Sequence, residues 1–149
     1  MIPNYEDIEN EWEDEDDSDF VVEPMPSLTY AMNIREKEFD KQQNNFVGKT
    51  DGTEAIRQAV IKILNTERYE HEIYSWDYGI ELKDLYGQPM VYCMSEIKVR
   101  ITEALLVDDR IESVENFEVE RTGKRTMVVK FQVTTQEQDE IDIESEVDV

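Results

Sequence analysis

The sequence predicts an α+β domain in which two long helices pack on a small antiparallel sheet with a C-terminal β-hairpin, flanked by acidic extended tails at both ends. Three observations support this prediction. Two segments carry apolar residues three and four positions apart, a later pair of segments alternates around a Thr-Gly-Lys turn, and the negative charge is concentrated at the two ends. The chain, with 149 residues, has room for one such domain.

The charge distribution divides the chain into three parts. Residues 1–27 contain eleven acidic and no basic residues, and residues 136–149 contain seven acidic and no basic residues, so the ends hold 18 of the 22 net negative charges. Segments of this composition repel themselves and bury too little apolar surface to offset the entropy of ordering. We therefore predict an acidic extended or disordered tail over residues 1–27, a folded domain over residues 28–135, and an acidic C-terminal tail over residues 136–149.

The domain is expected to begin with two short strands and a helix. Alternation from Leu28 to Ile34 predicts a strand, and Phe46 and Val47 predict a return strand that Gly48 ends. Asp51 is one of the polar residues placed to cap the helix that follows. The apolar stripe of this helix comprises Ala55, Ile56, Ala59, Val60, Ile63 and Leu64, which leaves Arg57, Gln58, Lys62 and Asn65 on its other side.

Aromatic residues crowd the segment after this helix, at Tyr69, Tyr74, Trp76 and Tyr78. Tyrosine and tryptophan bury large areas while keeping one polar group, so we expect these rings to fold the segment back on the helix. One or two helical turns are expected between Ile80 and Tyr86, before Gly87.

A second helix is predicted to start at Pro89, which suits a first helical turn. Its apolar stripe comprises Met90, Cys93, Met94, Ile97, Ile101, Ala104 and Leu105. Because the single cysteine of the chain, Cys93, lies in this stripe, we expect a buried, inert thiol and no internal disulfide.

The predicted hairpin closes the domain. Val114, Phe117 and Val119 lead to the turn at residues 122–124, and alternation returns along the strand from Arg125 to Val133. That last strand is expected to be an edge, which either is covered or accepts a strand from a partner protein.

The residues show no arrangement for catalysis, metal binding or cofactor binding. His71 lies between two glutamates without a nucleophile placed beside it, and it lacks the paired ligand spacing of a zinc site. Asp19 and Met25 stand where a calcium loop starting at Asp14 needs glycine and glutamate. The isolated glycines form no phosphate-binding loop, and a net charge of −22 disfavours nucleic acid. These exclusions point to a binding protein that is no enzyme.

Several short motifs resemble the baseplate wedge proteins that initiate the sheath in contractile phage tails and tail-like bacteriocins, in the version of Gram-positive prophages, with distant relatives in type VI secretion baseplates. The resemblance covers about residues 28–133. Its most specific points are Asp51-Gly52, Glu54-Ala55, Arg57-Gln58, Ile63-Leu64, Thr66-Glu67-Arg68 and Tyr78-Gly79.

This resemblance implies a structural role without catalysis. The protein is expected to bind wedge proteins, to offer a strand edge to the first ring of sheath subunits, and to lie near tube or hub proteins, in about six copies around the tail axis. Thr66, Glu67 and Arg68 match the wedge-contacting motif, although a Glu-Arg pair after a helix also fits internal capping. The expected sheath-binding edge comprises Met127, Val128, Val129, Lys130, Phe131, Gln132 and Val133.

Two other functions stay open at this point. An acidic decoy would bind a basic protein partner through its charge, and a muramidase-type lysozyme would use two carboxylates. No apolar run approaches the roughly twenty residues that span a bilayer, and the acidic N-terminus is unlike a signal peptide. We therefore expect assembly in the bacterial cytoplasm and a final location in a phage baseplate or tail-like particle, with no membrane or nucleic-acid partner.

Overall fold

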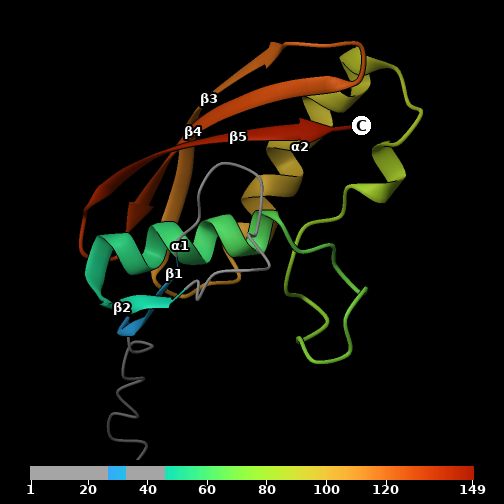
Figure 1. Ribbon diagram of the computed structural model, residues 1–149. Coiled ribbons are helices and arrows are strands. Elements are labelled where there is room, and N and C mark those ends of the chain that lie inside the picture. Colours follow the sequence, from blue (N-terminus) through green and yellow to red (C-terminus); the bar gives the residue numbers. More distant parts are fainter. Residues whose placement is uncertain (1–26, 33–45) are drawn as a thin grey trace, which may run out of the picture.

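A computed structural model describes residues 27–32 and 46–149 (Figure 1). These residues contain two α-helices of 13 and 16 residues and two antiparallel sheets, which confirms the α+β class. Two predictions lie outside the described residues. These are the tail over residues 1–27, of which only Ser27 is described, and the end of the first strand after Met32. In chain order the elements are β1 (Thr29–Met32), β2 (Phe46–Thr50), α1 (Gly52–Leu64), the 3-10 helix η2 (Lys83–Leu85), α2 (Met90–Leu105), β3 (Ile111–Arg121), β4 (Thr126–Thr135) and β5 (Glu140–Asp148).

The larger sheet has the order β3-β4-β5, and both helices cover the same face of it (Figure 1). Alternate residues of β4 and β5 point into the core between sheet and helices, while the residues between them face outward. The buried sheet residues include Met127, Val129, Phe131, Val133, Ile141 and Ile143. The smaller sheet, β1-β2, lies next to α1.

Helix α1 begins as predicted, with Asp51 as its N-cap, whose carboxylate accepts a hydrogen bond from the backbone N–H of Gly52 at 2.8 Å. Gln58, expected on the outer side, is instead buried. Its amide oxygen accepts from the N–H of Met32 at 2.8 Å, and its amide nitrogen donates to the carbonyl of Tyr30 at 2.9 Å. The polar residue therefore pairs with the backbone of β1 and attaches the small sheet to α1.

Helix α2 follows Pro89 and buries most of the predicted stripe, with Cys93, Ile97 and Ile101 each 0% exposed, while Met90 and Met94 are partly buried. The thiol of Cys93 is buried as expected and donates to the carbonyl of Leu85 at 3.5 Å. The turn from α2 into β3 is fixed by Asp108, whose carboxylate accepts from the guanidinium of Arg110 at 2.8 Å. Burial disfavours the charged carboxylate, but the bonds from Arg110 outweigh it and hold the pKa of Asp108 below its ordinary value.

The prediction of an acidic C-terminal tail over residues 136–149 is wrong, because Glu140–Asp148 forms strand β5 and pairs with β4 along its whole length. Ile141, Ile143 and Val147 are buried in the core, while the acidic residues between them point to the outer face. Burial of these apolar side chains, at about 1.5–3 kcal/mol each, offsets the charge repulsion that argued for disorder.

The prediction that the strand up to Val133 is an edge is wrong for the same reason. Strand β4 is central, with β3 on one side and β5 on the other, so its backbone groups are used on both sides. The residues affected are Met127, Val128, Val129, Lys130, Phe131, Gln132 and Val133.

Candidate functional site

The segment after α1 leaves the body of the protein as a loop and returns at Ile80 (Figure 1). Its two ends are joined by a bridge in which the N–H of Arg68 donates to the carbonyl of Ile80 at 3.0 Å. In return, the N–H of Ile80 donates to the carbonyl of Thr66 at 2.9 Å. The loop over residues 69–78, which we call the aromatic loop, therefore starts and ends at one fixed point.

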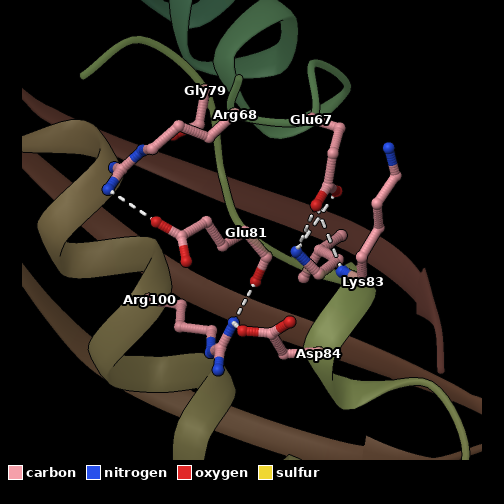
Figure 2. A network of polar contacts seen from close by, with 8 residues as sticks. Glu67, Arg68, Gly79, Glu81, Lys83, Asp84 and Arg100 are labelled. Carbon is pink, nitrogen blue, oxygen red and sulfur yellow. Dashed lines mark hydrogen bonds and ion pairs between the residues drawn. The ribbon is translucent and has the colours of Figure 1, made fainter. Parts of the chain in front are cut away.

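The side chain of Arg68 strengthens this point from inside the molecule. Its Nε donates to the carbonyl of Gly79 at 3.1 Å, and its Nη1 lies 3.3 Å from a carboxylate oxygen of Glu81 (Figure 2). The backbone carbonyl of Glu81 accepts from Arg100 of α2 at 2.6 Å. The guanidinium of Arg68, only 15% exposed, thus ties the loop to the strand-like segment that leads to η2.

Glu67 and Thr66 also bond inward. The carboxylate of Glu67 accepts from the N–H groups of Leu82 and Lys83 at 3.1–3.2 Å, at the start of η2 (Figure 2). The hydroxyl of Thr66 donates to the carbonyl of Lys62 at 2.8 Å. Of the two roles considered for residues 66–68, the geometry gives them the internal one, and a wedge contact through these side chains stays a prediction.

The aromatic loop exposes large side chains to solvent. Tyr69 is 69%, Ile73 85% and Trp76 80% exposed, so the prediction that the rings pack on the helix is wrong for Tyr69 and Trp76. Tyr78 is partly buried against the core, and Tyr74 stacks on it with ring centroids 4.5 Å apart.

The backbone of the loop explains this outcome. Three tight turns, closed by the N–H groups of Glu70, Tyr74 and Tyr78, satisfy the loop within itself, so it does not need to fold back on α1. The carboxylate of Asp77 takes part in the same local bonding. It accepts hydrogen bonds from Ser75 and from the backbone N–H of Asp77 itself, and these hold the pKa of Asp77 below its ordinary value.

The outer edge of β5 is the second exposed feature. The bonds from the N–H of Thr135 to the carbonyl of Asp139 and from the N–H of Val149 to the carbonyl of Arg125 show that odd-numbered residues of β5 face β4. The even-numbered residues therefore direct their backbone groups outward, and no strand among the described residues pairs with them. These residues are Glu140, Asp142, Glu144, Glu146 and Asp148, all exposed. One outward carbonyl, that of Asp142, accepts from Arg57 of α1 at 2.7 Å.

The opposite edge of the sheet, along β3, is irregular. The β3–β4 pairing shifts between Glu115 and Glu118, and Asn116 has a left-handed backbone with φ 55°. A bulge of this kind bends the strand and blunts its edge, whereas β5 pairs without interruption over nine residues.

Other chemistry finds little support in the described part of the chain. No group of three His, Cys, Asp or Glu residues there is arranged to hold a metal ion, and every buried side-chain nitrogen or oxygen has a hydrogen-bond partner. Neither described helix is long and apolar enough to cross a membrane. Exposed aromatic residues on a braced loop and a regular strand at the border of a sheet are features that occur at contacts between proteins.

Comparison with known proteins identifies the family. The model of the contractile injection system sheath initiators matches residues 28–138, so the chain belongs to this family and the predicted resemblance is confirmed. A similar protein is the phage-like element PBSX protein XkdS of Bacillus subtilis (strain 168), with 45% identity over 89 residues, or 58% of this chain. The match spans 62% of the length of that relative.

The fold resembles a solved structure described as a putative tail lysozyme from Geobacter sulfurreducens. The TM-score is 0.58 with 16% identity, and the match covers 67% of this chain and 93% of the other. At this identity the likeness concerns the fold.

Strand β5 is the element of the candidate site that the sequence prediction missed. The signal was present, because Ile141, Ile143 and Val147 occupy alternate positions between acidic residues. The high charge of the segment concealed that pattern.

Proposed function

We propose that this protein is a structural baseplate component of a contractile tail or injection particle, which binds the wedge and nucleates the sheath by accepting a strand on the outer edge of β5. Membership of the sheath-initiator family supports the baseplate role. The observation that carries the proposal is the regular pairing of β5 at the border of the described sheet, which directs the backbone groups of its even-numbered residues away from β4.

The edge of β5 suits strand addition better than that of β3. Its pairing with β4 is continuous, so an incoming strand meets evenly alternating donors and acceptors. Main-chain hydrogen bonds supply affinity in such an arrangement, and the alternating side chains set the alignment. The bulge at Asn116 interrupts this pattern on β3.

The wedge contact is assigned to the aromatic loop. Glu67 and Arg68 hold its base, and the exposed side chains of Tyr69, Ile73 and Trp76 supply the contact area. Large aromatic side chains carry much of the binding energy at protein interfaces. In this proposal the Thr-Glu-Arg motif acts by positioning the loop.

A proline substitution in β5 tests the sheath contact. Because the N–H of Glu144 points away from β4, Glu144→Pro keeps the ladder to β4 but removes one outward donor and obstructs the edge. We expect baseplates with tubes and without sheath when a particle-producing strain carries only this variant, as seen by electron microscopy. The matched control Glu144→Gln makes the same change of charge, keeps the N–H, and should give sheathed particles. Normal sheaths with a folded Glu144→Pro variant would refute the proposal.

The acidic decoy is the second candidate, since the exposed acids of β5 lie with Glu118 and Glu120 on one rigid face of the sheet. A decoy would bind a basic protein in the absence of any particle. Glu118→Lys combined with Glu120→Lys would weaken that binding, whereas the baseplate role predicts that this variant still assembles with sheath.

A further inference from the structure

A groove of about 320 Å³ lies along the C-terminal half of β5. Residues 145–148 of β5 contribute to its lining, together with Glu67, Glu70 and Tyr86. The lining also includes the aliphatic residues Leu64, Ile80, Leu82 and Ile101. The groove therefore adjoins both the strand edge and the base of the aromatic loop.

The two faces of this edge differ in chemistry. On the helix side, an incoming strand would lie over Leu64 and Leu82, which are only partly buried and pack against the core. On the outer side its residues would lie beside Glu144, Glu146 and Asp148, of which Glu144 already has the ammonium of Lys130 3.5 Å from its carboxylate. Neighbouring strands place side chains of the same face next to each other, and opposite charges in such positions attract.

We propose that this groove takes an extended segment of a partner protein in which lysine or arginine alternates with aliphatic residues. The aliphatic side chains cover the groove floor, and the basic side chains pair with the carboxylates of β5. This inference rests on the proposed function and specifies the sequence pattern of the strand that is added.

Charge excludes two other occupants. A second copy of β5 would place carboxylates opposite carboxylates, because all its outward-facing positions on that side are acidic. The N-terminal part of the chain, with eleven acidic and no basic residues before Leu28, meets the same repulsion. The acidic edge thus disfavours self-association and selects a basic strand.

Peptide titration of the full-length protein tests the inference. One peptide alternates lysine and valine, and a second alternates glutamate and valine. We expect the lysine peptide to bind, to shift the backbone amide NMR signals of Glu144 and Glu146, and to bind more weakly as salt is added. The glutamate peptide should not bind. Equal binding of both peptides would overturn the inference.

Charge reversal locates the site. Glu144→Lys combined with Glu146→Lys should lower the affinity for the lysine peptide about tenfold or more. Glu118→Lys combined with Glu120→Lys makes the same change at the same spacing on β3 and should change it less than about twofold. An equal loss of affinity in both double variants would show that only the net charge matters, and it would contradict binding in the groove. A gain of tenfold or more on removing residues 1–26 would make that segment the occupant instead.

The inference and the proposed function fail separately. Sheathed particles with Glu144→Pro would contradict the function. A second outcome separates the two. If Glu144→Pro loses the sheath while the Glu144→Lys and Glu146→Lys double variant has a normal sheath, strand addition is supported and a basic partner strand is contradicted.

Discussion

The backbones of Gly79 and Thr66 lie so close that a Cβ atom at position 79 would fall 2.5 Å from the carbonyl oxygen of Thr66. Gly79 also has φ 97°, a backbone conformation that favours glycine. The same carbonyl accepts the hydrogen bond from Ile80 that closes the aromatic loop. The base of the loop therefore depends on a residue without a side chain.

Gly79→Ala should lower the free energy of unfolding by about 2–4 kcal/mol, because it adds steric overlap to backbone strain. Gly87→Ala is the matched control, since Gly87 has φ 82° with nothing within 4 Å of the added Cβ, and it should cost about 1 kcal/mol. Chemical denaturation of both variants measures the difference. An equal loss of stability in the two variants would show that the backbone around Thr66 moves to accommodate the added Cβ without a further loss of free energy.

Arg68→Ala should destabilise the fold by about 1–3 kcal/mol, because it leaves the carbonyl of Gly79 and the carboxylate of Glu81 without this partner. Lys83→Ala removes an exposed ion pair with Glu70 and should change stability by less than about 0.5 kcal/mol. The midpoint of chemical denaturation measures the stability of both variants. If Arg68→Ala is as stable as the unmodified protein, the internal bonds of Arg68 do not stabilise the fold, and a contact of Arg68 with a partner protein is favoured instead.

Trp76→Ala should leave the free energy of unfolding within about 0.5 kcal/mol, since the ring is 80% exposed, yet sharply reduce incorporation into baseplates. Val91→Ala, at a residue 82% exposed on α2, is the control and should incorporate normally. Quantitative immunoblotting of purified particles measures incorporation. Normal incorporation of the Trp76→Ala variant would contradict the proposal that the aromatic loop contacts the wedge.

The Asp108–Arg110 pair should make stability depend on pH. Because the pKa of Asp108 in the folded protein lies below its ordinary value of 3.8, its contribution is fully present above that value and is lost as the pH falls through the folded-state pKa. Asp108→Asn should therefore cost about 1–2 kcal/mol at neutral pH and progressively less below about pH 4. Denaturation curves of both proteins over this range test it, and a difference independent of pH would contradict the assignment.

Periodicity was sufficient to predict both helices and the β3–β4 hairpin, because each has one buried face. It did not suffice for β5, where the average charge of the segment outweighed the alternation of Ile141, Ile143 and Val147. The roles of Glu67 and Arg68 depend on Gly79, Glu81 and Leu82, residues brought close only by the return of the loop. The number of aromatic rings likewise could not show whether local turns would leave them in solvent.

The hydrogen bond from Arg57 to Asp142 bears on how far the proposed added strand extends along β5. It occupies one outward acceptor of β5 with a guanidinium supplied by α1, so this end of the edge is already engaged. A strand displaced towards the turn at residues 136–139 would compete with that arginine, whereas one placed towards Asp148 would not meet it. In the proposed complex, this side chain of α1 thereby marks the end of the length over which an added strand pairs with β5.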